Sequence, residues 1–254
     1  MKIYFASDVH LGAPSIDDHR AHELNFVSWL DKIKNDADEI YLLGDIFDYW
    51  YEYSTVVPKG FVRFLGKLCE ITDKGIKVHI FTGNHDVWMW DYLPRECGVT
   101  VHHENYTFSC DGKRYYIGHG DGLNNYDRGY NLLKWIFEWK VAQVCYSCLH
   151  PDIAGWIAKT WSHSSRKRDN KNTKFHSFRG EEEHQVMFAR DYLSKGNSMD
   201  YFIFGHRHVL ADYKLEPSSS RLLVLGEWMS KYSYAVSDNG ELTLHEWRQD
   251  KDAN

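Results

Sequence analysis

Five short apolar runs, each followed by polar residues, constrain the fold of this chain more than any other feature of its sequence. The runs are rich in β-branched and aromatic residues, which is typical of buried strands. Apolar residues at helical spacing fill residues 22–34 and 61–71 and separate the first three runs. Strands that alternate with helices predict an α/β domain. The five runs are residues 3–6, 40–43, 78–81, 115–117 and 201–204.

The pattern changes after Gly122. Residues 130–161 predict helices rich in Trp, which charged residues interrupt too often for a membrane span. A basic, polar stretch over residues 163–174 follows, and a further helix over residues 181–193 leads back to the last of the five strands.

We therefore predict a core formed by residues 1–122 and 196–254, with residues 123–195 inserted into it as a helical cap. Residues 222–247 predict β-hairpins, with a turn at Asp238-Asn239-Gly240.

Composition and charge exclude several classes of protein. Hydrophobic residues make up 43% and charged residues 26% of the chain, which excludes a wholly disordered protein. The net charge of -6 argues against a protein that coats nucleic acid. The 5 cysteines are scattered, and no apolar stretch is long enough for a signal peptide or a membrane span. We expect a cytoplasmic protein with no nucleic-acid partner and no evident protein partner.

Each of the five predicted strands is followed by side chains that can bind a metal ion. Because the carboxyl ends of strands in an α/β sheet converge at one edge, we expect these side chains to meet there. The donors exceed what one ion needs but suit two ions that share a carboxylate. Mixed imidazole and oxygen ligands favour Mn, Fe or Zn over Mg or Ca, and a pair of such ions is a device for phosphoryl transfer. The expected ligands are Asp8, His10, Asp45, Asn84, His119, His206 and His208.

His85 adjoins the expected ligand Asn84 but is surplus to the ligand set. It could donate a proton to the leaving oxygen or stabilise the charged transition state. Asp86 or Asp48 could orient a histidine from behind. Any one of these motifs alone is more often an ordinary turn or a structural histidine, whereas five in order on strand ends predict a dimetal site.

These residues resemble the motifs of the calcineurin-like metallophosphoesterase superfamily: Asp-x-His, Gly-Asp-x-x-Asp, Gly-Asn-His-Asp, Gly-His and Gly-His-x-His, in that order from Asp8 to His208. The resemblance implies a four-layer α/β/β/α sandwich. It also implies two ions that share Asp45 as a bridge and catalyst. One ion would be held by Asp8, His10, Asp45 and His208, and the other by Asp45, Asn84, His119 and His206.

Within that superfamily, residues 7–12, residues 44–50 and the insertion between His119 and His206 are most similar to the UDP-2,3-diacylglucosamine pyrophosphohydrolases of lipid A biosynthesis. That family cleaves a diphosphate, usually with Mn²⁺, and releases UMP and 2,3-diacylglucosamine 1-phosphate. Its cap holds two acyl chains. The best-known members carry Arg where this chain has His85, so the exact substrate stays open. The resemblance implies substrate contacts by Asn84, Asp127, Ser165, Arg166 and His206.

The predicted insertion combines a Trp-rich part with a basic part, which suits a lipid-linked nucleotide as substrate. It also suits peripheral contact with the cytoplasmic face of the inner membrane. The alternative is a small satellite core with a solvated loop. Two other functions stay open: a phosphatase or phosphodiesterase for soluble nucleotides or phosphoproteins, and a scaffold with a dead site, although no expected ligand is missing.

Overall fold

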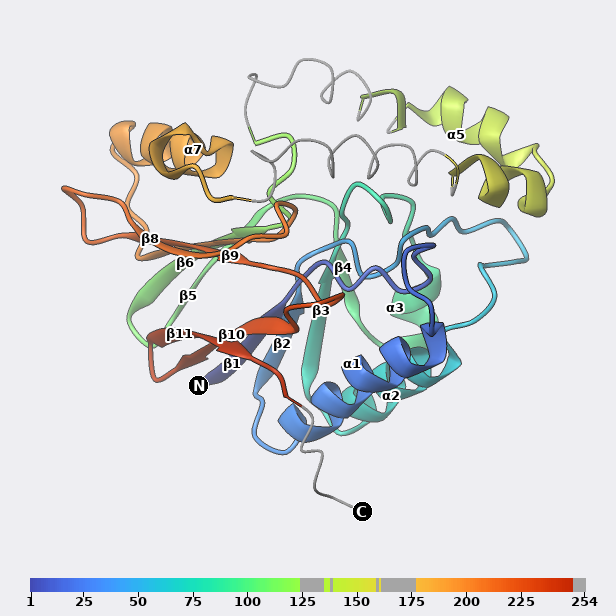
Figure 1. Ribbon diagram of the computed structural model, residues 1–254, viewed down its shortest axis with the longest axis horizontal. Coiled ribbons are helices and arrows are strands. Elements are labelled where there is room, and N and C mark those ends of the chain that lie inside the picture. Colours follow the sequence, from blue (N-terminus) through green and yellow to red (C-terminus); the bar gives the residue numbers. More distant parts are fainter. Residues whose placement is uncertain (124–134, 138, 159, 161–176, 249–254) are drawn as a thin grey trace.

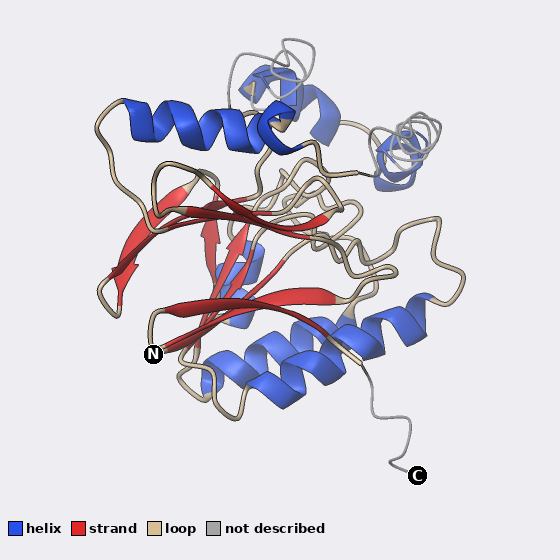
Figure 2. Ribbon diagram, turned by 60° about the vertical axis from the view of Figure 1, so that its left-hand side comes forward, coloured by secondary structure: helices blue, strands red, loops and turns tan. Residues whose placement is uncertain are grey.

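Two β-sheets lie face to face, and helices cover the outer face of each, as Figures 1 and 2 show. The computed structural model describes residues 1–123, 135–137, 139–158, 160 and 177–248. This arrangement confirms the predicted four-layer α/β/β/α sandwich.

The first sheet has the strand order β11-β10-β1-β2-β3-β4. Its four parallel strands are β1 (Lys2–Ala6), β2 (Glu39–Leu42), β3 (Lys77–Phe81) and β4 (Thr100–His102). The hairpin of β10 (Ser233–Asp238) and β11 (Glu241–Glu246) adds to this sheet antiparallel to β1.

The second sheet has the strand order β5-β6-β7-β9-β8. Its parallel centre is β6 (Lys113–Gly118), β7 (Tyr201–Phe204) and β9 (Arg221–Leu225), and the antiparallel edges are β5 (Tyr106–Cys110) and β8 (Leu210–Lys214). Residues 222–247 were predicted to form β-hairpins: β10 and β11 form one, and β9 forms another with β8, which precedes the predicted range. The strand β9 also pairs in parallel with β7, and four of its five side chains are buried in the second sheet.

Alternating side chains of the strands build separate cores on the two faces of each sheet. Ile3 and Phe5 of β1 pack between the sheets, whereas Tyr4 and Ala6 face the outer helices. Those helices are α1 (His19–Ile33), α2 (Val62–Asp73) and the short α3 (Tyr92–Cys97). The side chain of Asp18 caps α1 by accepting a hydrogen bond from the backbone N–H of Ala21 (2.8 Å).

The helix α7 (His184–Ser194) covers the second sheet. Its Val186 and Ala189 pack against Phe202 and Phe204 of β7. Besides α7, the predicted insertion of residues 123–195 contributes α5 (Lys140–Ser147), helical residues 151–158 and the 3-10 turn η2 (Gly180–Glu182). The boundaries of the predicted insertion stay a prediction. Among the described residues, no helix is both long and apolar enough to cross a membrane.

Candidate metal centre

The expected ligands come from loops at the carboxyl ends of strands in both sheets. Asp8 and His10 follow β1, and Asp45 follows β2. The remaining ligands follow β3, β6 and β7. We predicted convergence at the edge of one sheet. The structure brings the loops of two facing sheets together instead. His10 and His208 are thus in contact although they lie 198 positions apart in the sequence.

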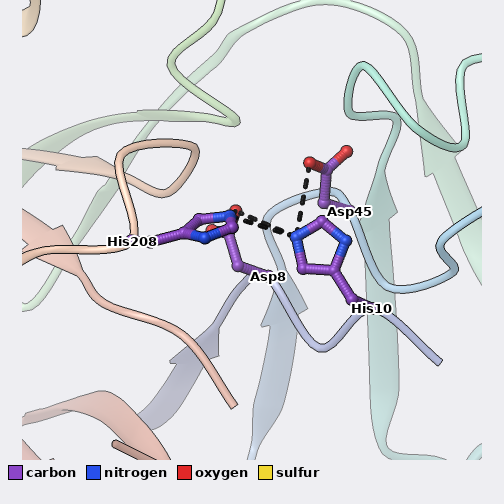
Figure 3. Close-up of side chains that lie close together, drawn as sticks. All are labelled: Asp8, His10, Asp45 and His208. Atoms are coloured by element: carbon purple, nitrogen blue, oxygen red, sulfur yellow. Dashed lines mark hydrogen bonds and ion pairs between the residues drawn. The ribbon is translucent and has the colours of Figure 1, made fainter. Parts of the chain in front are cut away.

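Four of these side chains point toward one another in Figure 3: Asp8, His10, Asp45 and His208. One ligand atom of each lies within 4.8 Å of the other three. His208 Nε2 lies 3.1 Å from both Asp8 Oδ1 and His10 Nε2. His10 Nε2 lies 3.7 Å from Asp45 Oδ2. The four donors thus surround a common point.

A second group extends from the other side of Asp45. His119 Nε2 lies 3.4 Å from Asp45 Oδ2 and 3.2 Å from Asn84 Oδ1. Asn84 Oδ1 also lies 2.9 Å from His206 Nδ1. Asp45 therefore contacts both groups, as a bridging carboxylate would.

Five of the seven expected ligands have backbones in the left-handed region. The φ angles are 56° for Asp8, 51° for His10, 53° for Asp45, 68° for His206 and 52° for His208. Such a conformation costs a non-glycine residue about 1–3 kcal/mol and persists only where the surroundings enforce it. It is typical of functional sites and turns each side chain sharply off its strand.

Two glycines make room for the carboxylates. A Cβ on Gly83 would lie 2.2 Å from Asp45 Oδ1, and a Cβ on Gly205 would lie 1.9 Å from Ser7 Oγ and 2.4 Å from Asp8 Oδ2. Any side chain at either position would push the loops apart. The glycines in the sequence motifs thus serve close approach between loops.

Hydrogen bonds fix the direction of the ligand atoms. Asp8 Oδ2 accepts hydrogen bonds from Ser7 Oγ (2.6 Å) and from the backbone N–H of His206 (2.8 Å). Asp8 Oδ1 is buried and has no hydrogen-bond donor among the described residues. His119 Nδ1 lies 2.9 Å from the carbonyl of Leu43, and this contact orients the ring so that His119 Nε2 points toward Asp45. A buried carboxylate oxygen without a donor, beside imidazole nitrogens, fits a divalent transition-metal ion.

Electrostatics keep the two buried carboxylates ionised. Burial raises the pKa of Asp45, but the imidazoles of His119 and His85 outweigh it and hold that pKa well below its usual range. Burial also opposes ionisation of Asp8, but the neighbouring imidazoles of His10 and His208 outweigh it and lower its pKa overall. Both carboxylates are therefore in the form that binds a cation at neutral pH.

Burial, together with the neighbouring His119, lowers the pKa of His206 to about 4. At neutral pH the His206 imidazole is therefore unprotonated. An unprotonated nitrogen is the form that can donate its lone pair to a metal ion.

His85 lies beside the first group. Its backbone N–H donates to Asp45 Oδ1 (2.9 Å), and its ring stands edge-on to that of His10 at 4.9 Å. Its side chain is 17% exposed, so a substrate can reach it. His85 Nδ1 lies 3.2 Å from the backbone carbonyl of Asp48 and 3.6 Å from Asp48 Oδ1. The same Oδ1 lies 3.4 Å from His10 Nδ1, so Asp48 can orient both rings.

Asp86, the other carboxylate considered for that role, contacts backbone instead. It accepts hydrogen bonds from the backbone N–H groups of Gly83, Asp45, Ile46 and Phe47 at 2.7–3.2 Å. Asp86 therefore ties the loop after β2 to the loop after β3.

Sequence reasoning missed a layer of side chains behind the ligands. The buried His22 lies on α1, and its Nε2 is 2.7 Å from the carbonyl of Val9, between two expected ligands. Arg207 is buried between His206 and His208. A histidine on the apolar side of a predicted helix was the only signal for His22. The expected substrate contacts Asp127, Ser165 and Arg166 lie outside the described residues.

Comparison with known proteins agrees with this geometry. The family model described as calcineurin-like phosphoesterase matches residues 1–210. The chain belongs to this family. As a calcineurin-like phosphoesterase it is a metal-dependent hydrolase, and the resemblance inferred from its motifs is confirmed.

Several curated relatives of this phosphoesterase share a single name. A protein named UDP-2,3-diacylglucosamine hydrolase from Porphyromonas gingivalis (strain ATCC BAA-308 / W83) is 39% identical over 253 residues, which cover 96% of each chain. A protein of the same name from Shewanella sp. (strain W3-18-1) is 28% identical over 94% of this chain and 95% of its own. Another from Blochmanniella pennsylvanica (strain BPEN) is 28% identical over 94% of this chain and 92% of its own. The similarity therefore includes the insertion as well as the core.

Proposed function

We propose that this phosphoesterase hydrolyses the diphosphate of UDP-2,3-diacylglucosamine and releases UMP and 2,3-diacylglucosamine 1-phosphate, a step of lipid A biosynthesis. The observation that carries the proposal is the 39% identity to a protein named for that substrate, over 96% of both chains. A relative that shared only the metal centre would support no particular substrate, because the core hosts many phosphoesterases.

The ligand groups support a centre of two divalent ions. Asp8, His10, Asp45 and His208 would hold one ion. Asp45, Asn84, His119 and His206 would hold the other, with Asp45 shared. Imidazole and oxygen ligands in one site suit a first-row ion, and we propose Mn²⁺ because it is the usual ion of the family that the motifs resemble. When bound, such ions make water nucleophilic at neutral pH and neutralise charge on phosphoryl oxygens.

Side chains of the protein would then contact the phosphoryl group and donate the proton to the leaving oxygen. Asn84 and His206 are the partly exposed members of the second group, and they would also contact a phosphoryl oxygen. His85 would donate a proton to the leaving oxygen, and Asp48 would keep its ring in position. Beyond the described residues, we propose Asp127, Ser165 and Arg166 as contacts to the sugar and head group.

The insertion is attached to the core next to this centre. Tyr51 Oη donates to the carbonyl of Gln143 (2.9 Å), and Trp88 Nε1 donates to the carbonyl of Phe137 (3.0 Å). The ring of Tyr146 packs on both Tyr51 and Trp88. These contacts hold α5 beside the loops that carry the ligands.

Other apolar side chains of the insertion are left at the surface. Trp156 is 67% exposed and Trp135 is 59% exposed. Several large exposed apolar groups on successive segments of one insertion favour contact with lipid or another apolar partner. We propose that this surface, the apolar face, receives the acyl part of the substrate and rests on the cytoplasmic side of the inner membrane. The apolar face consists of Trp135, Ile136, Trp139, Val141, Val144, Ile153, Trp156 and Ile157.

A direct test offers the Mn²⁺-loaded enzyme two substrates: UDP-2,3-diacylglucosamine in detergent micelles and a soluble aryl phosphodiester. We expect UMP and the acylated sugar phosphate as products, with much higher kcat/KM for the lipid-linked nucleotide. Turnover of the soluble ester alone would contradict the proposal and favour a phosphodiesterase for soluble substrates. The variant Asp45→Asn, tested in parallel, shows whether the activity belongs to this site.

A further inference from the structure

A buried ion pair joins the start of α7 to the loop after β7, which carries two of the expected ligands. Arg207 lies between His206 and His208, and its side chain is 9% exposed. Its Nε donates to Glu183 Oε1 at 2.5 Å, and the Glu183 side chain is fully buried. A pair so enclosed is not screened by solvent, in contrast to a surface salt bridge.

Glu183 is the N-cap residue of α7 and is held by a second cation. Arg179 Nη2 lies 3.3 Å from Glu183 Oε1, and the Arg179 backbone N–H donates to Glu183 Oε2 (3.3 Å). Burial opposes ionisation of Glu183, but Arg207 and Arg179 outweigh it and lower the pKa. Glu183 is therefore a fixed anion on a rigid element.

Gln185, in the first turn of α7, holds the same loop at its start. Its Nε2 donates to the carbonyl of Gly205 (3.0 Å). The same atom lies 2.3 Å from where a Cβ on Gly120 would be, directly after the expected ligand His119. The start of α7 thus contacts this loop on both sides of His206. Gln185 contacts Gly205 before it, and Glu183 contacts Arg207 after it.

The loop needs such support because its backbone is strained. His206 and His208 have φ angles of 68° and 52°, and Arg207 N–H donates to the carbonyl of Gly205 (2.8 Å) in a tight turn. Without contacts from outside, this turn would relax and the two imidazoles would move apart.

We infer that Glu183 is a positioning residue, which holds His206 and His208 in metal-binding geometry through its buried ion pair with Arg207. The inference rests on the proposed dimetal function. It assigns to α7, a helix with no residue among the expected ligands, a share in the affinity for the metal.

The test measures Mn²⁺ affinity without turnover, by electron paramagnetic resonance of free Mn²⁺ during titration of the metal-free protein. Partners that orient metal ligands typically contribute about 10- to 100-fold in affinity. We expect Glu183→Gln to weaken the affinity for Mn²⁺ by that factor. At saturating Mn²⁺ we expect kcat to recover and KM for substrate to stay unchanged.

The matched control is Glu181→Gln, two positions earlier. Glu181 forms an ion pair with Arg190 at the surface and accepts a hydrogen bond from Tyr213 Oη, and neither partner belongs to the loops of the expected ligands. We expect the Glu181→Gln variant to bind Mn²⁺ with an affinity within about twofold of the parent, since exposed ion pairs contribute little to stability. Equal losses in the two variants would overturn the inference.

Removing one partner of a buried ion pair can also destabilise the fold, so a second variant combines Glu183→Gln with Arg207→Met. Removing both charges commonly restores stability. We expect a melting temperature of the metal-free protein near that of the parent, with Mn²⁺ affinity still weakened. Parental affinity in this variant, or failure of both variants to fold, would show that the pair serves only the fold.

The outcomes also separate this inference from the proposed function. A parent protein that binds fewer than two Mn²⁺ ions contradicts the dimetal function itself. A parent that binds two ions, combined with a Glu183→Gln variant of equal affinity, contradicts only the role of Glu183.

Discussion

The ligand loops at the sheet ends and the apolar face of the insertion differ in how their side chains are held. In the ligand loops, Asp8, His10 and Asp45 are buried and their backbones are strained. On the apolar face, Trp156 and Val144 are more than half exposed on regular helix. Chemistry on phosphorus needs atoms fixed to fractions of an ångström, whereas acyl chains need only area. The comparison predicts large effects from small changes in the first region and graded effects in the second.

The strongest test of this contrast is Asp45→Ala. It removes the carboxylate that contacts both ligand groups, so neither ion would keep its full ligand set. We expect a loss of turnover greater than about 10³-fold, which exceeds the loss of a single transition-state hydrogen bond. Steady-state kinetics measure the loss of turnover, and metal analysis measures the loss of bound ions. The exposed Asp73→Ala serves as control, and activity near that of the parent in Asp45→Ala would remove the basis of the site assignment.

The next test is His85→Ala. If His85 donates the proton to the leaving oxygen, turnover should fall by about 10²–10⁴-fold. Metal content should stay unchanged, because His85 is surplus to both ligand groups. Metal analysis decides the interpretation: an accompanying loss of Mn²⁺ would make His85 a ligand and not an acid.

A smaller effect is expected from adding one methyl group. Gly205→Ala would press a Cβ against Ser7 and Asp8, and should lower the free energy of unfolding by about 1–3 kcal/mol and weaken metal binding. The same change at Gly66, a helical glycine of α2 with open space around it, should raise that free energy by about 0.5–1 kcal/mol. Denaturant unfolding compares the two. If both substitutions changed the free energy of unfolding in the same direction, the ligand loops would be packed no more closely than the surface of α2.

The smallest effect on the fold is expected on the apolar face. Trp156→Ser should change the free energy of unfolding by less than about 0.5 kcal/mol, because the ring is exposed. Binding to vesicles with anionic lipids should nevertheless fall several-fold. Val62→Ser, at a residue that is 73% exposed on α2, is the matched control and should leave vesicle binding unchanged. Equal vesicle binding by the parent and both variants would argue that the apolar face meets no membrane.

The sequence predicted those parts of the molecule that local pattern determines. Each expected ligand follows a strand, and a glycine beside Asp45, Asn84 or His206 marks where the backbone must turn. The periodicity of apolar residues likewise predicted α1, α2 and α7. Such features depend on neighbours within a few positions, and this explains why one sequence was enough to predict them.

What the sequence did not predict depends on contacts between distant segments. The strand pattern by itself predicted one sheet for the expected ligands, whereas two facing sheets carry them, because pairing of β7 with β6 and β9 is set by packing over long separations. Arg207 resembles a solvated charge in sequence, yet it is buried against Glu183, 24 positions away. Asp86 resembles a partner for histidine, yet its oxygens are occupied by backbone N–H groups.

The central claim is that side chains from five separate loops hold two cations around Asp45. Anomalous diffraction at the manganese edge, on crystals of the Mn²⁺-loaded protein, tests it most directly. The account predicts two peaks about 3.5–4 Å apart, both in contact with Asp45, one among Asp8, His10 and His208 and the other among Asn84, His119 and His206. A single peak, or peaks away from Asp45, would contradict it.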